Sequence, residues 1–269
     1  MSNRGKLFFF LLLSLLAIGC GEDDEQSPGT PFNDCVPLQF VSHMPGNYAT
    51  YDLTYTGGRP VKVTNANAYF VVSTRTVTYD GDAIIKVTEA GEEHTVETTY
   101  HFAGGNLPVK SDVTLDGAFI WSFFFEYSGD KLTKVVYATP HLDTDWEWQL
   151  VITYNGNDDV TKLDYEFLTG PSAGSHAITT VASYDDHPNP YAKLPMWKFM
   201  MNRSWDNYDP EVLLVALSRH NPMDYTFATW TRAYTYTYNA EGFPTERVVT
   251  TTTAGGTSSF NEVFTYACD

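Results

Sequence analysis

One short motif has the pattern of a hydrolase nucleophile. Residues 170–174, Gly-Pro-Ser-Ala-Gly, match the G-x-S-x-G sequence in which Ser172 would attack a carbonyl carbon. That chemistry requires a strand before the turn and a helix after it, so that the serine is held exposed. The residues that follow, 179–184, are rich in Thr and Val and are typical of a strand. The context therefore favours a flexible hairpin loop over a catalytic elbow.

A second candidate is a run of alternating acids. Asp143, Asp145 and Glu147 would share one face of a strand, with Trp146 and Trp148 on the other. Such carboxylates could act as acid and base on a glycosidic bond or bind Ca²⁺. Alternating acids on the solvated face of a strand are also ordinary. We expect the ordinary arrangement.

The remaining polar residues define no reaction. The acids Asp80, Asp82, Asp130, Asp158 and Asp159 fall in sequences typical of tight turns. The seven histidines show no H-x-H or H-E-x-x-H spacing, and there is no phosphate loop or dinucleotide fingerprint. We expect no metal, no cofactor and no catalytic residue.

The N-terminus predicts export and lipid attachment. Arg4 and Lys6 precede an apolar run over residues 7–16, which is too short for a membrane-spanning helix. The run ends at Ala17-Ile-Gly-Cys20, where small residues before a cysteine are typical of a lipoprotein signal peptide. We expect residues 1–19 to be removed and Cys20 to be acylated, which would anchor the protein in a lipid bilayer.

Residues 20–34 predict a disordered tether. An acidic cluster over 22–25 is followed by a stretch rich in Pro, Gly and Ser. The acids directly after Cys20 resemble the export tag that Bacteroides-type bacteria use for lipoproteins on the outer face of the outer membrane. That resemblance implies a cell-surface protein, and the periplasmic leaflet is the alternative.

Composition limits the partners. The chain has 33 acidic and 16 basic residues, and removing Arg4 and Lys6 with the signal peptide takes the net charge from −17 to −19. Nucleic acid is therefore not an expected partner, because it requires clustered Lys and Arg. The 43% hydrophobic and 15% aromatic content can form a large β-rich core.

Residues 35–269 contain a degenerate repeat that predicts a single all-β domain. Each copy is a strand ending in Tyr, a turn rich in Gly, Asp and Asn, and a strand with Lys or Arg among Val, Ile and Leu. Copies begin near residues 51, 77, 125, 152 and 236, with a weaker one at 100 and a truncated one at 264–266. The turn residues tolerate the positive φ that tight hairpins require. We expect an antiparallel meander that forms a closed or nearly closed barrel-like sheet.

The Tyr-Asp/Asn-x-x-Gly-x-Pro repeat resembles the YD-type repeats of bacterial surface proteins. Residues 184–190 and 238–244 more particularly resemble a family of exported Bacteroides-type proteins of unknown function. The resemblance covers most of residues 48–266. It implies a porin-like β fold and brings no functional residues with it.

With Cys20 acylated, Cys35 and Cys268 remain at the two ends of the repeat array. An oxidising compartment favours their pairing in a disulfide, which would bring the first and last strands together.

One segment, residues 185–232, interrupts the repeat. Asp209-Pro210-Glu211 predicts a helix start, and Asn221-Pro222 predicts its end. The segment gathers four aromatic side chains that could anchor a ligand: Trp197, Trp205, Tyr208 and Trp230. The alternative is that they are buried where the helix packs on the sheet as a plug or lid.

These observations lead to two hypotheses of function. The first is a non-catalytic surface lipoprotein whose β scaffold binds a glycan or protein ligand. The second is an accessory protein that binds or degrades polysaccharide.

Overall fold

The computed structural model describes residues 35–44, 47–67, 72–139, 147–192 and 210–268. All of them belong to one compact unit, residues 32–269. Some residues singled out in the sequence lie outside the described residues, and the interpretations of them stay predictions: Cys20, Asp143, Asp145, Trp146, Trp197, Trp205 and Tyr208.

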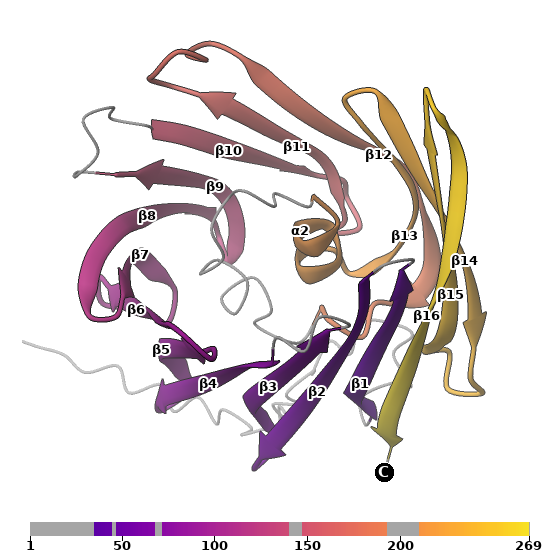
Figure 1. Cartoon of the computed structure of the whole chain (residues 1–269), viewed down its shortest axis with the longest axis horizontal. Helices are drawn as coiled ribbons and strands as arrows, with labels where there is room; N and C mark the ends of the chain where they lie inside the picture. The colour runs from indigo at the N-terminus through magenta and orange to yellow at the C-terminus, as the bar shows by residue number, and fades with distance from the viewer. Residues whose placement is uncertain (1–34, 45–46, 68–71, 140–146, 193–209, 269) are drawn as a thin grey trace, which may run out of the picture. The chain divides into compact units, whose positions relative to one another are not determined.

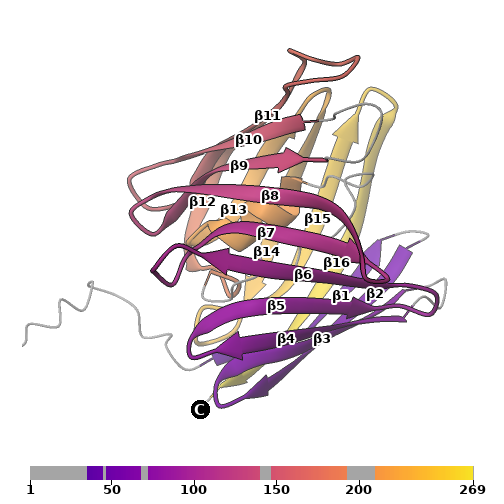
Figure 2. The same ribbon diagram turned by 90° about the vertical axis from the view of Figure 1, so that its left-hand side faces the viewer.

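Sixteen antiparallel strands form a closed barrel in which each strand pairs with its neighbours along the chain, and β16 pairs with β1 (Figures 1 and 2). The predicted all-β meander and its closure are therefore confirmed. The strands are β1 (Cys35–Met44), β2 (Asn47–Thr56), β3 (Arg59–Asn67), β4 (Val72–Asp80), β5 (Ala83–Ala90), β6 (Thr95–Phe102), β7 (Pro108–Leu115), β8 (Ala118–Ser128), β9 (Lys131–Ala138), β10 (Glu147–Tyr154), β11 (Val160–Phe167), β12 (His176–Pro188), β13 (His220–Phe227), β14 (Trp230–Tyr238), β15 (Pro244–Thr253) and β16 (Gly256–Cys268). A short helix, α2 (Pro210–Leu217), lies between β12 and β13 in the sequence.

Each repeat predicted from the sequence is one hairpin with a β-bulge after its turn. In the first copy Tyr55 pairs with Pro60, and the register then shifts past Val61. Tyr238 pairs with Pro244 in the same way, and the shift falls at Thr245. A proline suits this position because it has no N–H to donate to the strand ladder, and bulges tolerate that loss.

The repeat tyrosines also join successive hairpins to one another. Each hydroxyl donates a hydrogen bond to the backbone carbonyl of a residue at or near the start of the second strand of the preceding hairpin. On β14 the donor is Tyr236, two residues before the tyrosine that pairs with Pro244. The bonds are Tyr55 to Pro37 (2.7 Å), Tyr79 to Pro60 (2.8 Å), Tyr127 to Pro108 (2.9 Å), Tyr154 to Leu132 (2.9 Å), Tyr184 to Val160 (2.6 Å), Tyr236 to Pro222 (2.9 Å) and Tyr266 to Pro244 (2.8 Å). At the one remaining joint the chain has Phe102, which has no hydroxyl. We call this set the tyrosine ring.

The two faces of the barrel wall differ in polarity. Inward side chains such as Leu53, Val87, Phe123 and Leu150 form a continuous buried core with Leu214 of α2. The alternate residues point outward and are mainly Thr, Lys, Asp and Glu. On β14, for example, Thr231, Thr235 and Thr237 are exposed and Tyr234 between them is buried.

Helix α2 lies inside the barrel (Figure 1). Leu213, Leu214 and Ala216 are buried, and the helix contacts β11 and β13. The predicted helix is confirmed. The interruption of the sheet is shorter than the predicted 185–232, because residues 185–188 end β12 and residues 220–232 belong to β13, its turn and the start of β14. No helix in the described residues is both long and apolar enough to cross a membrane.

Candidate functional site

The most concentrated buried charge in the described structure lies where α2 meets the barrel wall. Glu211, in the first turn of α2, forms ion pairs with Arg232 on β14 and with Arg247 on β15. Arg247 also pairs with Glu262 on β16. The four side chains are 11% exposed or less, so the network is almost wholly removed from water. We call these four residues the charge network.

Aromatic rings surround both arginines of the charge network. The guanidinium of Arg232 lies 5.0 Å from the ring centroid of Trp230, and that of Arg247 lies 4.9 Å from that of Tyr234. Phe40 and Phe264 approach Arg247 at 5.9 and 5.7 Å. Such contacts stabilise a desolvated cation by roughly 0.5–2 kcal/mol each.

Electrostatics act differently on the two carboxyl groups of the charge network. Burial alone would raise the pKa of Glu211, but Arg247 and Arg232 outweigh it and hold that pKa below its usual value. For Glu262 burial dominates and raises the pKa. The Glu211 carboxylate is already held by two arginines, so it lacks the freedom that a general base needs.

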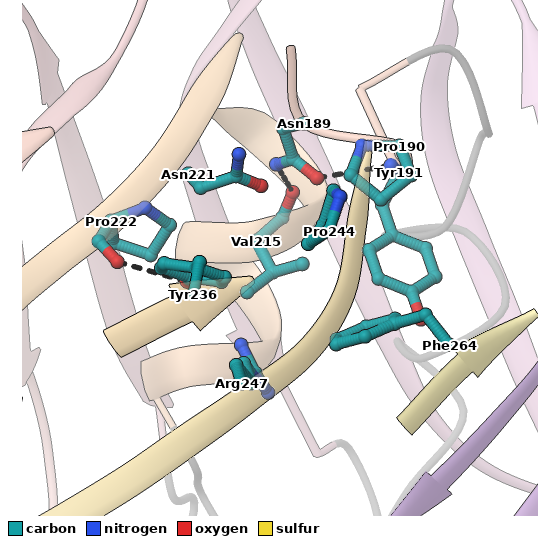
Figure 3. A pocket seen from close by; sticks show the side chains of 10 residues that line it. All are labelled: Asn189, Pro190, Tyr191, Val215, Asn221, Pro222, Tyr236, Pro244, Arg247 and Phe264. Carbon is teal, nitrogen blue, oxygen red and sulfur yellow. Dashed lines mark hydrogen bonds between the residues drawn. The ribbon is translucent and has the colours of Figure 1, made fainter. Parts of the chain in front are cut away.

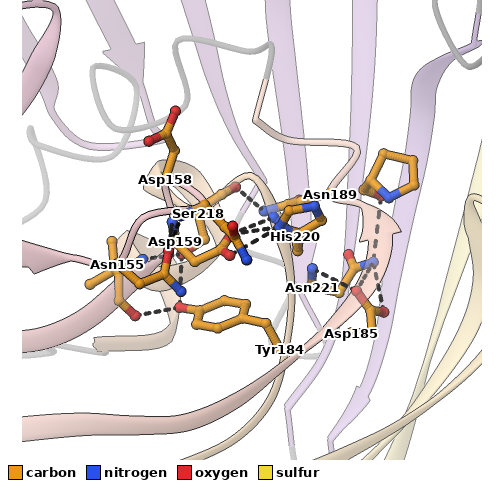
Figure 4. A network of polar contacts seen from close by, with 12 residues as sticks. Asn155, Asp158, Asp159, Tyr184, Asp185, Asn189, Ser218, His220 and Asn221 are labelled. Atoms are coloured by element: carbon orange, nitrogen blue, oxygen red, sulfur yellow. Dashed lines mark hydrogen bonds and ion pairs between the residues drawn. The ribbon is translucent and has the colours of Figure 1, made fainter. Parts of the chain in front are cut away.

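The far end of α2 is held by a second set of polar contacts (Figure 4). The Asp159 carboxylate lies 3.0 Å from Nδ1 of His220 and accepts a 2.8 Å hydrogen bond from the His220 backbone N–H. The Asn189 side-chain amide donates to the backbone carbonyls of Val215 (2.5 Å) and Ser218 (2.9 Å). These are carbonyls that a helix C-terminus leaves without an intrahelical partner. The contacts therefore cap α2 and fix it to β11 and β13.

A serine, a histidine and an aspartate meet at this end of α2, but their geometry does not form a catalytic relay. The Ser218 hydroxyl accepts from the backbone N–H of Val160 (3.1 Å) and lies 2.9 Å from the Tyr184 hydroxyl. The hydrogen bonds of the His220 ring within the described residues go to Asp159 instead. Ser218 is also fully buried. A nucleophile must reach its substrate and its base, so these residues serve to position the helix.

A third group joins the end of β12 to β13 and β14. Asp185 accepts hydrogen bonds from the Asn221 side chain (3.1 Å) and from the Tyr238 hydroxyl. The His187 ring stacks on Tyr238 with the centroids 3.9 Å apart. Burial and the Asp185 carboxylate raise the pKa of Tyr238, so its hydroxyl remains a donor.

A small cavity lies between these polar groups and the barrel wall (Figure 3). Its volume is about 10 Å³, and its lining includes Asn189, Tyr191, Tyr236 and Arg247. That volume holds at most one water molecule. The cavity is therefore too small for an organic ligand.

The structure places the remaining predicted residues as follows. Residues 170–174 form the turn between β11 and β12, and no helix follows, so the hairpin-loop interpretation of the G-x-S-x-G sequence is confirmed. Glu147 begins β10 and is exposed, whereas Trp148 is buried on the opposite face.

Among the turn acids, Asp82 pairs with Arg59 and Asp158 with Lys131. Within the described ranges no group of three His, Cys, Asp or Glu residues could hold a metal ion.

Trp230 occupies a different place from the one the sequence suggested. It begins β14 instead of lying in the insertion, and its ring packs against Tyr225 and Phe227 with centroids 5.5 and 5.4 Å apart. Its ring is half-buried, and its other neighbour is Arg232. These contacts favour the core interpretation of Trp230 over the ligand-anchor interpretation.

The sequence analysis missed Arg232, Arg247 and Glu262. The signal that could have found two of them is the alternation of inward and outward residues along a strand. Arg247 lies on the same, inward face of β15 as buried Val249, and Glu262 lies on the same face of β16 as buried Phe264. A charged residue on an apolar face predicts a buried partner.

Comparisons with known proteins establish the fold alone. The structure is similar to the crystal structure of a porin-like protein from Bacteroides uniformis, with a TM-score of 0.60 and 14% sequence identity, over 89% of this chain and 99% of that chain. A porin-like protein from Bacteroides vulgatus is matched over 87% of this chain and 99% of that chain, at a TM-score of 0.41 and 12% identity. No family model matches the chain. No curated protein matches its sequence.

Proposed function

We propose that this chain is a surface lipoprotein in which acylated Cys20 is the membrane anchor and the barrel is a non-catalytic binding scaffold that stands in water. The observation that carries the proposal is the polarity of the barrel wall. Its inner face is mainly apolar and packed, with its charges paired in the charge network, and its outer face carries exposed charged and hydroxyl-bearing side chains.

The outward charges lie in the middle of the strands. Lys86 is the fourth of eight residues in β5, and Lys134 is the fourth of eight in β9. Lys86 lies 2.9 Å from Glu97 on the next strand, and Lys134 lies 3.0 Å from Glu126. Lys110 and Lys162 occupy similar positions on β7 and β11.

Such a wall is unsuited to lipid. Membrane-spanning barrels have an outward apolar band about 25 Å tall, and a Lys or Arg at the bilayer midplane costs about 2–4 kcal/mol. The exposed large apolar residues on the described strands are interspersed with charged ones. Val151 lies between Lys134 and Asp164, and Phe124 lies between Lys110 and Val136. The similarity to a porin-like protein is therefore a similarity of fold. The polarity of the inner and outer faces of the wall supports a barrel that is surrounded by water.

The interior supports a scaffold and argues against a pore or an enzyme. The polar side chains around α2 are paired with one another, in the charge network and in the contact between Asp159 and His220. The cavity beside them accommodates about one water molecule.

A cleavable tether tests the proposal. A specific protease site is placed between Gln26 and Pro31 of the full chain, which is expressed in its native envelope with radiolabelled palmitate. Cleavage of isolated membranes should release the barrel to the supernatant and leave the palmitate in the pellet. The same protein without the site is the control. A barrel that stays in the membrane after complete cleavage would contradict the proposal.

Two further measurements address the anchor and its side of the membrane. Cys20→Ala should abolish palmitate incorporation. Protease added to intact cells should digest the wild-type protein if it is on the surface. A lipidated protein that resists digestion until the outer membrane is permeabilised would indicate the periplasmic leaflet instead.

A further inference from the structure

The outer wall of the barrel is not uniform in charge. On β5–β11 the outward side chains include four lysines that pair with nearby acids, namely Lys86, Lys110, Lys134 and Lys162. On the described strands β14, β15 and β16 the outward positions of the strand ladders hold Thr, Ser, Ala, Val and Asn, and Glu246 is the one charged side chain among them. The wall therefore has a charged part and a neutral part.

A row of threonines crosses the neutral part from strand to strand. Five of them occupy paired positions on β12–β16, and all five are exposed: Thr180, Thr226, Thr231, Thr252 and Thr257. Neighbouring strands lie about 4.7–4.9 Å apart, so the row places its side chains at regular intervals over roughly 19 Å. We call these five residues the threonine row.

The hydroxyl groups of this region keep hydrogen-bonding capacity for a ligand. Thr252 and Thr257 lie with their hydroxyl oxygens 3.2 Å apart, and those of Thr250 and Ser259 lie 3.0 Å apart. A hydroxyl has one donor hydrogen and two acceptor lone pairs. Each pair uses one hydrogen, so the second hydrogen and the remaining lone pairs are left for solvent or for a ligand.

The threonine row lies at the end of the barrel that is remote from the tether. Thr257 is the second residue of β16 and Cys268 is the last, opposite Cys35 at the start of β1. Eleven residues at about 3.4 Å each separate Thr257 from Cys268 by roughly 37 Å along the strand. Figure 2 shows the turn between β15 and β16 and the C-terminus at opposite ends of these strands. In a lipoprotein anchored through Cys20, the row would face the medium.

Strand propensity alone does not account for the neutral part of the wall. Threonine is common in strands because its branched side chain fits a pleated sheet. The outward positions of β5–β11 have the same strand geometry, yet there Thr alternates with Lys, Asp and Glu. The feature to be explained is the replacement of these charges by hydroxyl groups on β14–β16.

We propose that the threonine row and the hydroxyl pair of Thr250 and Ser259 bind an extended, uncharged polysaccharide chain. The proposal rests on the proposed surface lipoprotein and names the class of ligand that its scaffold binds. The hydroxyl groups of a neutral sugar chain donate and accept hydrogen bonds, as those of Thr and Ser do.

Charge complementarity favours a neutral partner over a charged one. The net charge of −17 repels anionic polymers. A cationic partner would require several carboxylates, and the outward positions of β14–β16 offer Glu246 alone. A neutral chain can cover this face without the desolvation cost that buried charges impose.

Affinity electrophoresis of the full lipidated chain in detergent tests the proposal. Native gels are cast with one neutral polysaccharide each: dextran, amylose, mannan or laminarin. At least one of them should slow the migration of the protein in proportion to its concentration. Polygalacturonate and heparin are the anionic comparison and should not slow it.

Paired substitutions assign the binding to the threonine row. Thr231→Val with Thr252→Val removes two central hydroxyl groups and retains the branched side-chain shape. The dissociation constant for the neutral polymer should rise at least about fivefold, because two hydrogen bonds are lost. Thr64→Val with Thr74→Val removes a paired set from the outer wall of β3 and β4 and is the matched control, which should bind as the wild type does. Circular dichroism should show both variants folded.

Three results would overturn the proposal. They are no retardation by any of the four neutral polymers, equal affinity of the two double variants, and retardation by the anionic polymers that matches or exceeds that by the neutral ones. A wild-type dimer in sedimentation that Thr231→Val with Thr252→Val dissociates would also overturn it, because a second copy would then cover the row. The release of the barrel by tether cleavage is independent of these results, so failure here is distinguishable from failure of the proposed surface lipoprotein.

Discussion

Tyr266 on β16 lies opposite Pro37 on β1, in the register position that Tyr238 and Pro244 occupy within a single hairpin. The bulge that follows the proline in other repeats is also present, because the register shifts between Pro37 and Gln39. The copy that the chain end truncates after Tyr266 is thus completed by the first strand. The barrel contains a whole number of repeats, and one of them is assembled from the two ends of the chain.

Cys35 pairs directly with Cys268 in this assembled repeat, at the place where the other repeats have a turn. We predict a disulfide between them, which would connect β16 to β1 covalently where a turn connects the two strands of the other repeats. Closing a loop of 234 residues, 35 to 268, stabilises the fold by up to about 5 kcal/mol in the chain-entropy model. Cys35→Ser with Cys268→Ser should lower the free energy of unfolding in urea, and reductant should have the same effect on the wild type but none on the variant. Two free thiols in the intact mass of the purified exported protein would contradict the prediction.

The tyrosine ring predicts opposite effects for two matched substitutions. Tyr127→Phe removes the hydroxyl that donates to the Pro108 carbonyl and should lower the free energy of unfolding by about 0.5–1.5 kcal/mol. Phe102→Tyr adds a hydroxyl at the joint that lacks one. By the pattern of the other joints, its acceptor would be the carbonyl of Ile84, which pairs with Tyr79, and the free energy of unfolding should rise by a similar amount. Urea denaturation of both variants checks the pair. No change in the first and a loss in the second would show that the ring does not stabilise the barrel.

The hairpins were predictable because their determinants are local. The Tyr-Asp-Gly and Ser-Gly-Asp turns require positive φ, and Gly81 and Gly129 have it, at 55° and 64°. The closed sheet could be inferred from two cysteines at the ends of a repeat array. These features depend on residues within about one hairpin or at the chain ends, so one sequence is enough to recognise them.

The charge network could not be predicted, because its partners are far apart in the sequence. Glu211 was noted only as part of a helix start, and Arg247 lies 36 residues later in a Thr-rich strand. Strand β13 was missed because Pro222 was interpreted as a helix stop, although in the barrel it occupies the proline position opposite Tyr184. That error is the reason Trp230 was assigned to the insertion.

Removing the central carboxylate of the charge network should destabilise the fold strongly. Glu211→Gln removes the carboxylate that Arg232 and Arg247 share, and it leaves both buried guanidinium groups less well neutralised. Breaking a buried ion pair from one side typically costs about 3–5 kcal/mol, because the remaining charge stays desolvated. The matched control is Glu97→Gln, whose partner Lys86 is exposed and whose loss should cost about 1 kcal/mol or less. Thermal unfolding of both proteins measures the difference, and equal losses would mean that the network contributes no more than a surface pair.

The outer wall should make the protein sensitive to acid. Burial alone would raise the pKa of Asp112, but hydrogen bonds from Lys110 and Ser122 outweigh it, and the pKa lies below its usual value. The pKa of Asp164 is lowered in the same way by Lys162 and His176. A carboxyl whose pKa is lower in the folded than in the unfolded state contributes stability above its unfolded pKa, near about 3.9.

That contribution is lost as the pH falls through the folded pKa, so the melting temperature should drop below about pH 4. The variant with Asp112→Asn and Asp164→Asn should be less stable than wild type at pH 7 and should lose less on acidification. Thr99→Val, at the position opposite Asp112 on β6, is the uncharged control and should follow the wild-type pH dependence. Melting temperatures that fall equally for all three proteins between pH 5 and pH 3 would show that other groups determine the response to acid.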